Sequence, residues 1–566
     1  MTGGRALAEM VKLHEPGPIF GMGGFQLLPF YDGVRELKVK HVLINDERSG
    51  AFAANAYARV TGRPGLCDGT FGPGATNLVT GLVEALNAGT PIIAFVGEGH
   101  RDHAGKNMTQ ETDQRSILEP AVKAYLRVEA IRRIPELVRR AYGVATSGRP
   151  GPVIIAVPED VAHEESDFDP TDFWADPAAL VSPRYRTRGN PESISAAATL
   201  IRAARRPLIL VGGGVHLSSA YGELAEFAAA IDAPVAHTMS GKGAIADTDE
   251  RSVGVFGRYS RYANDLIERS DLLIVVGSKL GEVATKRYTI LPEAVPLIHV
   301  DIDAEEIGHW ARTTVGIAGD AALVLRDLTG AADPVAPRAE YWAEIRERRA
   351  AWAAEAAPRY SSDEAPVHMA RLIAELNTVL PPGGLLIADG GFASHWGALL
   401  YDTKSSGKCF VADRGFASIG YGLPGAIGAA LAGTPGPIVA FTGDGGFNMV
   451  AGELETARRE GLTFTLVVLN NAASGYVKAL QHAVYGAGNY ESTDLLDLDY
   501  SVIAEAYGCR GIRVDKPDQL AAAFESALGT AGRPTVIDVA VTRDPERMLP
   551  AVDSRTLRVE AGDRPA

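Results

Sequence analysis

Short apolar runs recur along the chain, and each is followed by a segment rich in alanine and leucine. The runs generally end at glycine or an acidic residue, and they occupy residues 41–45, 91–97, 153–158, 207–211, 272–277, 297–301, 385–389, 438–443, 465–470 and 535–539. A short uninterrupted apolar run is typical of a strand that is buried on both faces, and strands that alternate with helices predict parallel sheets. The pattern therefore predicts an α/β protein built from doubly wound parallel sheets.

Two stretches interrupt this alternation and read as linkers. Residues 164–193 are rich in Asp, Pro and Arg, and residues 331–366 carry several prolines around one amphipathic helix at 341–355. At 566 residues the chain is also too long for one hydrophobic core. The predicted domains are residues 1–165, 190–335 and 365–548, with a polar tail after Pro550. The first and third domains can be related in structure without visible similarity in sequence.

Composition narrows the classes of function. The net charge of −15 disfavours nucleic acid and anionic membrane as partners, because an acidic surface repels phosphate. Cys67, Cys409 and Cys509 lie too far apart for a disulfide framework or a zinc cluster. Residues 1–13 lack the features of a signal peptide, and no apolar stretch is long enough to span a membrane. We expect a cytoplasmic protein that acts on small molecules.

The strongest chemical signal lies at two strand ends of the third predicted domain. The run 438–443 enters a glycine turn that contains Asp444, and the next predicted strand ends in Asn470 and Asn471, 27 residues after Asp444 (471 − 444). That spacing holds one helix and a neighbouring parallel strand, so a carboxylate and an amide oxygen meet at one sheet edge. Both oxygens suit Mg²⁺, and a glycine turn at a helix start suits a phosphate group.

This pair of motifs resembles the diphosphate-and-magnesium motif of thiamine-diphosphate enzymes. The resemblance implies that Mg²⁺ is held by Asp444, the side chain of Asn471 and the backbone oxygen of Ala473. It further implies that thiamine diphosphate contacts Gly443, Gly445, Gly446, Gly475 and Tyr476. Family members use a Gln-His pair to hold the diphosphate where this chain has Gly390, Gly391, Phe392 and Ala393. Contacts there are therefore expected to come from backbone groups.

The first predicted domain follows the motif order of the acetolactate-synthase-like branch of this family. A predicted buried strand at 41–45 precedes Glu47 and a small-residue helix at 49–60, and the loop 69–77 ends in Asn77. The resemblance implies that Glu47 protonates the aminopyrimidine of the coenzyme and that Asn77 contacts the coenzyme. Taken alone, Glu47 is an acid at a helix start, a common stabilising position. Asp46 is expected to cap that helix.

Other coenzyme contacts also follow from the resemblance. Residues 109–113 resemble a segment whose glutamine reaches the reacting carbon, which makes Gln110 a candidate catalytic residue; the alternative is an exposed polar loop. Residues 415–428 resemble the family run that places a large apolar residue under the bent coenzyme. Ile419 takes that place, and the carbonyl of Ala417 is expected to face the pyrimidine amine.

Departures from the family pattern concern the substrate pocket. Authentic acetolactate synthases carry Met and Trp where this chain has Tyr476 and Leu480. Phe25 and Phe71 replace small residues in the first domain. A pocket of Phe25, Phe71, Gln110, Tyr476 and Leu480 would be more aromatic than small keto acids require, which puts dedicated synthesis of branched-chain precursors in doubt.

The central domain carries a glycine-rich turn at 212–214 after the predicted strand at 207–211. Such a turn alone is a weak indication of a dinucleotide site. Flavin-binding relatives have an Arg-Phe-Asp-Asp-Arg-like segment where this chain has Ser278 to Glu282. FAD in a structural role and a vestigial site both remain open.

The resemblance implies a thiamine-diphosphate-dependent carboligase that joins a 2-keto acid to a carbonyl acceptor. One alternative is a non-oxidative decarboxylase or lyase acting on an aromatic 2-keto acid or an acyl-CoA. Two more are a non-catalytic binding paralogue of the same fold and a flavoprotein that uses only the central domain. In this branch of the family the active sites lie between chains, which implies a homodimer or homotetramer.

Overall fold

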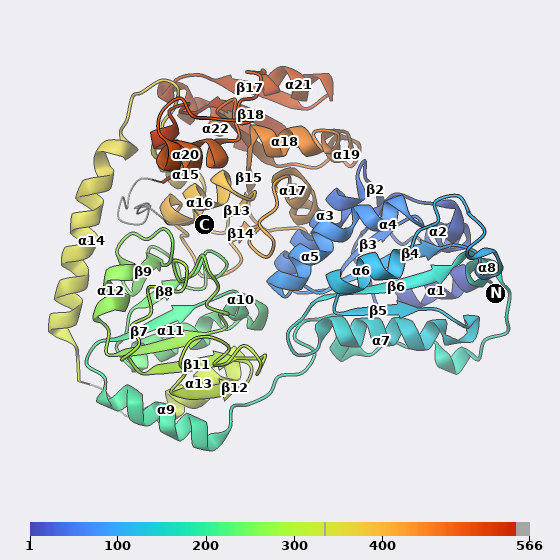
Figure 1. Ribbon diagram of the computed structural model, residues 1–566, viewed down its shortest axis with the longest axis horizontal. Helices are drawn as coiled ribbons and strands as arrows, with labels where there is room; N and C mark the ends of the chain where they lie inside the picture. The colour runs from blue at the N-terminus through green and yellow to red at the C-terminus, as the bar shows by residue number, and fades with distance from the viewer. Residues whose placement is uncertain (333–335, 551–566) are drawn as a thin grey trace.

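The computed structural model describes residues 1–332 and 336–550, so the polar tail predicted after Pro550 lies outside the described residues. It contains three sheets of six parallel strands, each with helices packed against it (Figure 1). The sheets lie within the three predicted domains, and the α/β fold class is confirmed. The limits between the domains stay a prediction. None of the described helices is long and apolar enough to cross a membrane.

The first domain contains the N-terminal sheet. Its strands are β1 (Ile19–Gly21), β2 (His41–Leu43), β3 (Gly65–Gly69), β4 (Ile92–Glu98), β5 (Ala124–Arg127) and β6 (Pro152–Pro158). Its helices are α1 (Gly3–Leu13), α2 (Leu28–Glu36), α3 (Glu47–Thr61), α4 (Pro73–Asn77), α5 (Val79–Ala88), α6 (Gln114–Leu118), α7 (Ile134–Thr146) and α8 (Glu159–His163).

The central domain follows the first linker. Its strands are β7 (Pro207–Val211), β8 (Val235–His237), β9 (Ser252–Val255), β10 (Leu272–Val276), β11 (Leu297–Asp301) and β12 (Val315–Ala318). Its helices are α9 (Pro191–Ala203), α10 (Gly214–Ser218), α11 (Tyr221–Ala230), α12 (Ala263–Arg269) and α13 (Ala321–Ala331). The long helix α14 (Ala339–Tyr360) then leads along one side of the molecule to the third domain (Figure 1).

The third domain contains the C-terminal sheet. Its strands are β13 (Leu385–Ala388), β14 (Phe410–Ala412), β15 (Ile438–Gly443), β16 (Thr465–Asn470), β17 (Arg510–Val514) and β18 (Thr535–Ala540). Its helices are α15 (Met369–Val379), α16 (Phe392–Leu400), α17 (Gly422–Leu431), α18 (Asp444–Val450), α19 (Glu453–Arg459), α20 (Gly475–Tyr485), α21 (Tyr500–Ala506) and α22 (Leu520–Leu528).

The first and third sheets share one strand order. The first runs β2-β1-β3-β4-β6-β5 and the third runs β14-β13-β15-β16-β18-β17, which is the same order counted from the start of each domain. The central sheet differs, since it runs β12-β11-β10-β7-β8-β9, the order of dinucleotide-binding folds. The expectation that the first and third domains can be structural relatives therefore agrees with their topology.

The predicted apolar runs all coincide with strands, but the prediction that the run at 41–45 is buried was wrong. The strand predicted as buried at 41–45 is β2, which lies at the edge of its sheet, and Leu43 is 50% exposed. The run is apolar even though only one neighbouring strand, β1, pairs with it. A continuous apolar run therefore did not distinguish an edge strand from a central one here.

The first and third domains are joined through two helices that pack closely, α3 and α17 (Figure 1). Gly428 of α17 lies against the backbone of α3, because a Cβ atom at this position would lie 2.1 Å from the carbonyl oxygen of Ala53. The hydroxyl of Tyr421 donates a hydrogen bond to Oδ1 of Asn55 at 3.1 Å. The contact depends on small residues at the helix crossing.

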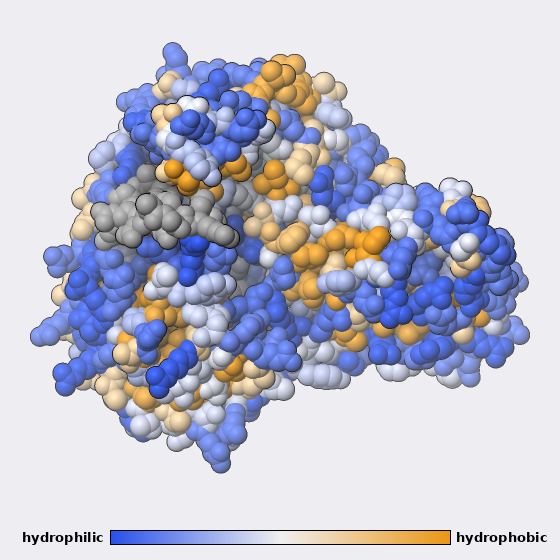
Figure 2. Space-filling view, viewed as in Figure 1, coloured by the Kyte–Doolittle hydropathy of each residue, from blue (hydrophilic) through white to orange (hydrophobic). Residues whose placement is uncertain are grey.

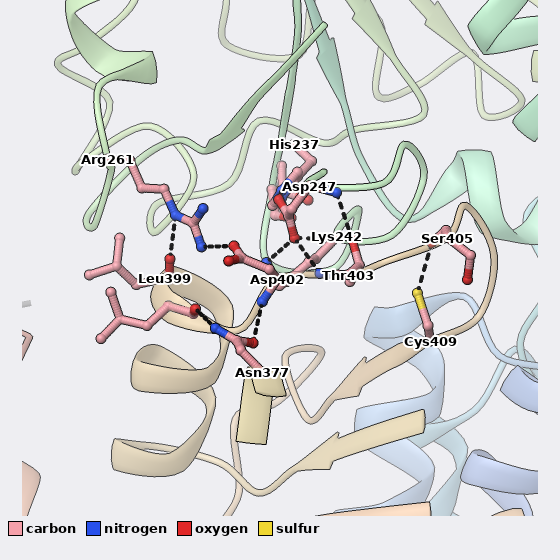
Figure 3. A network of polar contacts seen from close by, with 12 residues as sticks. His237, Lys242, Asp247, Arg261, Asn377, Leu399, Asp402, Thr403, Ser405 and Cys409 are labelled. Carbon is pink, nitrogen blue, oxygen red and sulfur yellow. Dashed lines mark hydrogen bonds and ion pairs between the residues drawn. The ribbon is translucent and has the colours of Figure 1, made fainter. Parts of the chain in front are cut away.

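A second link joins the central and third domains through buried charges (Figure 3). Asp247 accepts from Nζ of Lys242 at 2.6 Å, from the backbone N–H of Thr403 at 3.0 Å and from the Thr403 hydroxyl at 3.0 Å. Its other oxygen lies 3.0 Å from Nε2 of His237. Nearby, Arg261 forms an ion pair with Asp402 at 2.6 Å. Since every charge in this network has a partner, it holds the two domains in a fixed orientation.

Candidate active site

Asp444 begins α18 directly after β15, at the carboxyl end of the third sheet. The side chain is 2% exposed. Its Oδ1 accepts a hydrogen bond from the N–H of Gly445 at 2.8 Å, and its Oδ2 accepts one from the N–H of Ala473 at 3.3 Å. Burial raises the pKa of Asp444 to about 6, although the surrounding backbone N–H groups act in the opposite direction. A cation beside this carboxylate would offset that cost of burial.

Asn471 follows β16, which pairs with β15, and its side chain points to the same place. Its Oδ1 accepts a hydrogen bond from the N–H of Ala473 at 3.1 Å, so the Asp444 and Asn471 oxygens converge on one peptide group. A Cβ atom at position 475 would lie 2.3 Å from Nδ2 of Asn471, which requires Gly475. We call Asp444, Asn471 and Ala473 the Asp444 site.

The backbone beside this site faces open space. A Cβ atom at Gly443 would meet no atom within 4 Å, and one at Gly445 would meet only the Leu495 side chain, at 3.7 Å. The start of α18 thus leaves room for a phosphate group against backbone N–H groups. Gly446 is different, because a Cβ atom there would lie 2.8 Å from Oδ2 of Asp389.

Asp389, at the end of β13, organises the turns around the site and was not predicted from the sequence. Its buried carboxylate accepts hydrogen bonds from the N–H groups of Gly390 (2.7 Å), Gly420 (2.9 Å) and Tyr421 (3.0 Å), and from the Thr442 hydroxyl (2.6 Å). Burial raises the pKa of Asp389. One side chain therefore ties the turn at Gly390 to the segment that contains Ala417 and Ile419. An acid at the end of a predicted strand was the available signal.

Phe392 and Ala393 begin α16, and neither side chain offers a hydrogen bond, as the missing Gln-His pair implies. Gly391 has φ of 62°, which favours glycine at this turn. Ala417 has φ of 57°, a left-handed conformation that turns the backbone sharply between Phe416 and Ser418. Ile419 is 43% exposed and so remains free to contact a ligand or another chain.

Glu47 begins α3 at the carboxyl end of the first sheet and is buried. Its Oε2 accepts a hydrogen bond from Nδ2 of Asn77 at 3.0 Å. A Cβ atom at position 74 would lie 2.8 Å from Oε1, so Gly74 allows the loop to approach the carboxylate. Asp46 caps α3 as predicted, since its side chain accepts a hydrogen bond from the N–H of Arg48 at 2.8 Å. We call Glu47, Gly74 and Asn77 the Glu47 site.

The loop before Glu47 is fixed by a residue of the third domain that sequence analysis missed. The buried Glu453 of α19 accepts hydrogen bonds from the N–H groups of Asn45 at 3.0 Å and Asp46 at 3.1 Å. Burial raises the pKa of Glu453. This contact spans about four hundred residues of sequence, and no local pattern marks it.

Gln110 is exposed and has φ of 68°, beside the loop that leads to Asn77. Its Oε1 accepts a hydrogen bond from Nε2 of Gln26 at 3.4 Å, and Oε1 of Gln26 accepts one from the Thr70 hydroxyl at 2.9 Å. Phe71 is buried beside them. A Cβ atom at Gly72 would lie 2.2 Å from the carbonyl oxygen of Gln110, so the structure places Gln110 against the loop that contains Phe71 and leads to Asn77 of the Glu47 site.

The other predicted pocket residues lie in two different domains. Phe25 is 61% exposed, and its ring lies 6.2 Å from that of His163 on α8. Tyr476 and Leu480 lie one helical turn apart on α20 and pack against the core of the third domain. Within the described residues, 1–332 and 336–550, no hydrogen bond or ion pair joins the Glu47 site or Gln110 to the Asp444 site.

A cavity of about 340 Å³ lies at the carboxyl ends of β7, β10 and β11 in the central domain. Gly212, Gly213, Gly214 and Gly277 line it, at the point where the strand order reverses. Asp301 also lines the cavity, and burial raises its pKa to about 6. The cavity extends to Arg414 and Gly415 of the third domain.

Comparison with known proteins agrees with this arrangement. Family models described as thiamine pyrophosphate enzyme match three segments: the N-terminal TPP binding domain at residues 1–117, the central domain at 194–328 and the C-terminal TPP binding domain at 389–539.

Relatives align along nearly the whole chain. A probable acetolactate synthase large subunit from Methanocaldococcus jannaschii is 33% identical over 98% of this chain and 93% of its own length. The acetolactate synthase large subunit of Corynebacterium glutamicum is 33% identical over 96% of this chain and 87% of its own length. The large subunit of acetolactate synthase isozyme 2 from Escherichia coli is 29% identical, covering 96% of each chain.

Proposed function

Because this chain belongs to the family of thiamine pyrophosphate enzymes, we propose that it is a thiamine-diphosphate-dependent carboligase acting on a 2-keto acid. The observation that carries the proposal is the pair of sites at the carboxyl ends of two equally ordered sheets. The Glu47 site offers a buried carboxylate held by an amide, and the Asp444 site offers oxygen ligands beside an open glycine turn. A binding paralogue without catalytic function would need neither Glu47 nor Asn77 in this arrangement.

The residues fit the coenzyme and its metal ion. Asp444, Asn471 and the backbone oxygen of Ala473 are hard oxygen donors, as Mg²⁺ prefers, and two of them already converge on one peptide group. Gly443 and Gly445 leave room for the diphosphate. When bound, thiamine diphosphate supplies the carbanion chemistry that cleaves or forms a bond beside a carbonyl.

The protein's own groups control protons and position. Glu47 would hold a proton at the pyrimidine, and Asn77 would keep the Glu47 carboxylate in place by donating to Oε2. Gln110 would donate to the oxygen of the reacting carbonyl. Ala417 and Ile419 would hold the coenzyme from below, on the segment that Asp389 fixes.

We also propose that a second copy of the chain completes each site, in a homodimer or a pair of dimers. Among the residues that the structure describes, no hydrogen bond or ion pair joins the Glu47 site to the Asp444 site of the same chain. Phe416 (53%) and Ile419 (43%) are exposed next to the proposed coenzyme site. Figure 2 shows hydrophobic surface gathered where the first and third domains meet. Apolar surface of this kind is typical of an interface between chains.

Mixing two inactive variants tests this assembly. In a heterodimer of Glu47→Gln and Asp444→Ala chains, one site collects both lesions and the other collects none. Activity should therefore recover toward about half of the wild-type sites in each heterodimer. Unmixed variants under the same exchange conditions are the control. If exchange is proven by mass and no activity returns, each site is built within one chain.

The central cavity supports binding of a nucleotide at the switch point of the sheet. FAD in a structural role and a vestigial site remain the two alternatives. The absorbance spectrum of the purified protein distinguishes them, because a bound flavin absorbs visible light and is released on denaturation. Neither outcome alters the assignment of the Glu47 and Asp444 sites.

The reaction itself is tested by offering 2-keto acids singly and in pairs, with and without aldehydes. Carbon dioxide release identifies the donor, and the mass of the product separates carboligation from decarboxylation. Because Phe71 and Tyr476 border the predicted pocket, the panel includes aromatic keto acids. Failure to release carbon dioxide from any keto acid, with coenzyme and Mg²⁺ bound, would refute the proposed reaction.

A further inference from the structure

A buried carboxylate of the first domain holds the segment that is expected to face the coenzyme. We call residues 415–419 the coenzyme-facing segment. Glu84 is fully buried on α5, at the edge of the first domain that faces the third (Figure 1). Its Oε1 accepts a hydrogen bond from the N–H of Gly415 at 2.9 Å, and its Oε2 accepts one from the N–H of Phe416. Glu84 therefore holds the start of the segment with both of its oxygens.

The coenzyme-facing segment is anchored at both ends. Beyond its far end, Asp389 accepts hydrogen bonds from the N–H groups of Gly420 and Tyr421. Ala417, with φ of 57°, lies between the two anchors. A left-handed conformation is costly for a residue that has a Cβ atom, so it persists only where the surroundings fix it. The carboxylates of Glu84 and Asp389, from two different domains, supply that restraint.

The segment lies directly against α5. A Cβ atom at Gly415 would lie 2.3 Å from the carbonyl oxygen of Glu84 and 3.0 Å from its Cδ, so the close approach requires glycine. The contact joins residues that are 331 positions apart in sequence. A change in the position of the Glu84 side chain would therefore be passed to the coenzyme-facing segment without an intermediate.

A second buried carboxyl group lies beside Glu84. Asp413 follows β14, two residues before Gly415, and is fully buried. Neither of its side-chain oxygens has a hydrogen-bond partner among the described residues. Burial and the charge of Glu84 raise the pKa of Asp413 well above its usual range. We call Glu84 and Asp413 the acid pair.

The two members of the acid pair differ in what stabilises a negative charge. Glu84 accepts two backbone N–H groups, whereas Asp413 accepts no hydrogen bond within the part of the chain that the structure describes. Two adjacent buried carboxyl groups cannot both ionise at low cost, so one of them keeps a proton. The charge therefore lies on Glu84 and the proton on Asp413, which becomes a donor to its neighbour.

The groups around the acid pair do not substitute for this proton. The charge of Arg59 acts to lower the pKa of Asp413, but burial and the charge of Glu84 outweigh it. Nη1 of Arg59 donates instead to the carbonyl of Ala412 at 2.7 Å. The charged and titratable groups that face the pair come from five places in the fold: Arg59, Lys279, Asp389, Arg414 and Tyr421.

We propose that Glu84 and Asp413 are positioning residues that share one proton, and that loss of this proton releases the coenzyme-facing segment and weakens binding of the coenzyme. With the proton present, Asp413 donates to Glu84, and Glu84 holds the N–H groups of Gly415 and Phe416. When the proton passes to water, two adjacent negative charges repel each other. Exchange with water is possible because Gly415 lines the central cavity. The effect on the coenzyme rests on the proposed function, whereas the shared proton does not.

Asp413→Asn tests the proposal, because its amide N–H donates to Glu84 at every pH. At about pH 6 the variant and the wild type should bind thiamine diphosphate with affinities that agree within about threefold. As the pH rises through the apparent pKa of the acid pair, the affinity of the wild type should fall relative to that of the variant, by up to about tenfold per pH unit. Equilibrium dialysis at saturating Mg²⁺, from about pH 6 to about pH 9, measures both.

The comparison removes other titrations, since the diphosphate and Glu47 ionise in both proteins and cancel in the ratio of affinities. Asp518→Asn, the same change at an exposed position of the third domain, should follow the wild type at every pH. Parallel profiles of Asp413→Asn and the wild type would overturn the proposal.

The free energy of unfolding reports the shared proton without any coenzyme. In the unfolded chain Asp413 has its usual pKa of about 4, so above that pH the folded protein holds a proton that the unfolded chain has released. The stability of the wild type should therefore fall relative to that of Asp413→Asn as the pH rises from about 4 to the raised pKa of the folded protein. Urea denaturation across that range measures the difference. A difference that does not change with pH would show that Asp413 carries no proton in the fold.

Glu84→Gln separates positioning from catalysis. Glutamine keeps one acceptor oxygen and turns an N–H₂ group toward the second backbone N–H, so the coenzyme concentration for half-maximal activity should rise at least about tenfold. Turnover at saturating coenzyme should change by less than about threefold. The exposed Glu164→Gln is the matched control. Lower turnover at saturating coenzyme with unchanged affinity would overturn the positioning role.

The two readouts separate this proposal from the proposed function. If the wild type binds no thiamine diphosphate, the proposed function fails, and the pH-dependent difference in stability still establishes the shared proton. If the wild type binds the coenzyme and forms carbon–carbon bonds while Asp413→Asn shows no pH-dependent difference in affinity or stability, the proposed function holds and the acid pair is refuted.

Discussion

The first and third sheets have the same strand order, yet they hold their key carboxylates in different ways. Glu47 is held by a side chain, since Nδ2 of Asn77 donates to its Oε2. Asp444 is held by the main chain, through the N–H groups of Gly445 and Ala473. Among the described residues, only Oε2 of Glu47 accepts a hydrogen bond, which leaves Oε1 open to exchange a proton, whereas both oxygens of Asp444 accept backbone hydrogen bonds, which fix that carboxylate as a ligand.

The difference shows how one topology supports two roles. Both acids begin a helix at the carboxyl end of a parallel strand, where ligands of α/β sheets bind. What differs is the loop that meets the acid. The loop after β3, two strands away from β2, supplies an amide side chain to Glu47, whereas the loop after β16, the neighbour of β15, supplies a peptide group to Asp444. Function therefore lies in the loops and not in the shared sheet.

The largest expected effect on turnover is that of Glu47→Gln. Turnover should fall by roughly 10²–10⁴-fold, the usual contribution of a positioned acid or base, because glutamine cannot carry the proton. Coenzyme affinity should change by less than about threefold, since the diphosphate anchor lies at the other site. Steady-state rates and equilibrium dialysis measure the two effects. Glu164→Gln, at an exposed position, is the control. Near-normal turnover in Glu47→Gln would remove Glu47 from the mechanism.

Asp444→Ala should weaken ligand binding, which Glu47→Gln should leave nearly unchanged. Mg²⁺ and thiamine diphosphate should be lost together, each with an affinity at least about 100-fold weaker, because each binds through the other. Equilibrium dialysis of the coenzyme at fixed Mg²⁺, and titration with Mn²⁺ followed by electron paramagnetic resonance, report the two ligands. The exposed Asp518→Ala is the matched control. Wild-type coenzyme affinity in Asp444→Ala would show that the metal ligands were assigned wrongly.

Local sequence patterns predicted the strands that are continuous apolar runs but missed others. The predicted apolar runs all became strands, whereas β3 (Gly65–Gly69) and β17 (Arg510–Val514) carry charged residues within them and were not recognised. β3 lies inside its sheet, where the buried Asp68 faces His41 at 3.2 Å. A buried acid with a distant partner cannot be told from a loop residue by its neighbours in sequence.

The sequence predicted part of the candidate site as well. The convergence of Asp444 and Asn471 follows from strand ends and spacing, and the contact of Glu47 with Asn77 agrees with the family motif order. The roles of Asp389 and Glu453 could not be predicted, because each joins segments that only the fold brings together.

Asn77→Ala probes how much the side-chain support of Glu47 matters. Removing the donor to Oε2 should lower turnover by about tenfold, within the range for residues that orient a functional group. Asn77→Asp should be worse, because a second carboxylate would repel that of Glu47. Pre-steady-state measurement of carbon dioxide release isolates the affected step. If alanine and aspartate have equal effects, Asn77 contributes space and not a hydrogen bond.

The smallest expected effect concerns the contact between the two sheets, and it tests whether both sites depend on a common packing. In Gly428→Ala the new Cβ atom would lie 2.1 Å from the carbonyl oxygen of Ala53, and backbone at a helix crossing cannot yield cheaply. Overpacking of this kind costs about 1–3 kcal/mol, so the melting temperature should fall by a few degrees. Gly222→Ala on α11 is the control: nothing lies within 4 Å of that Cβ position, and alanine should raise helix stability slightly. Since the crossing of α3 with α17 sets where the two sheets lie relative to each other, coenzyme affinity and turnover should decline together in Gly428→Ala. A loss of stability with both unchanged would show that each site is held by its own domain, with the partner chain and not this contact aligning them.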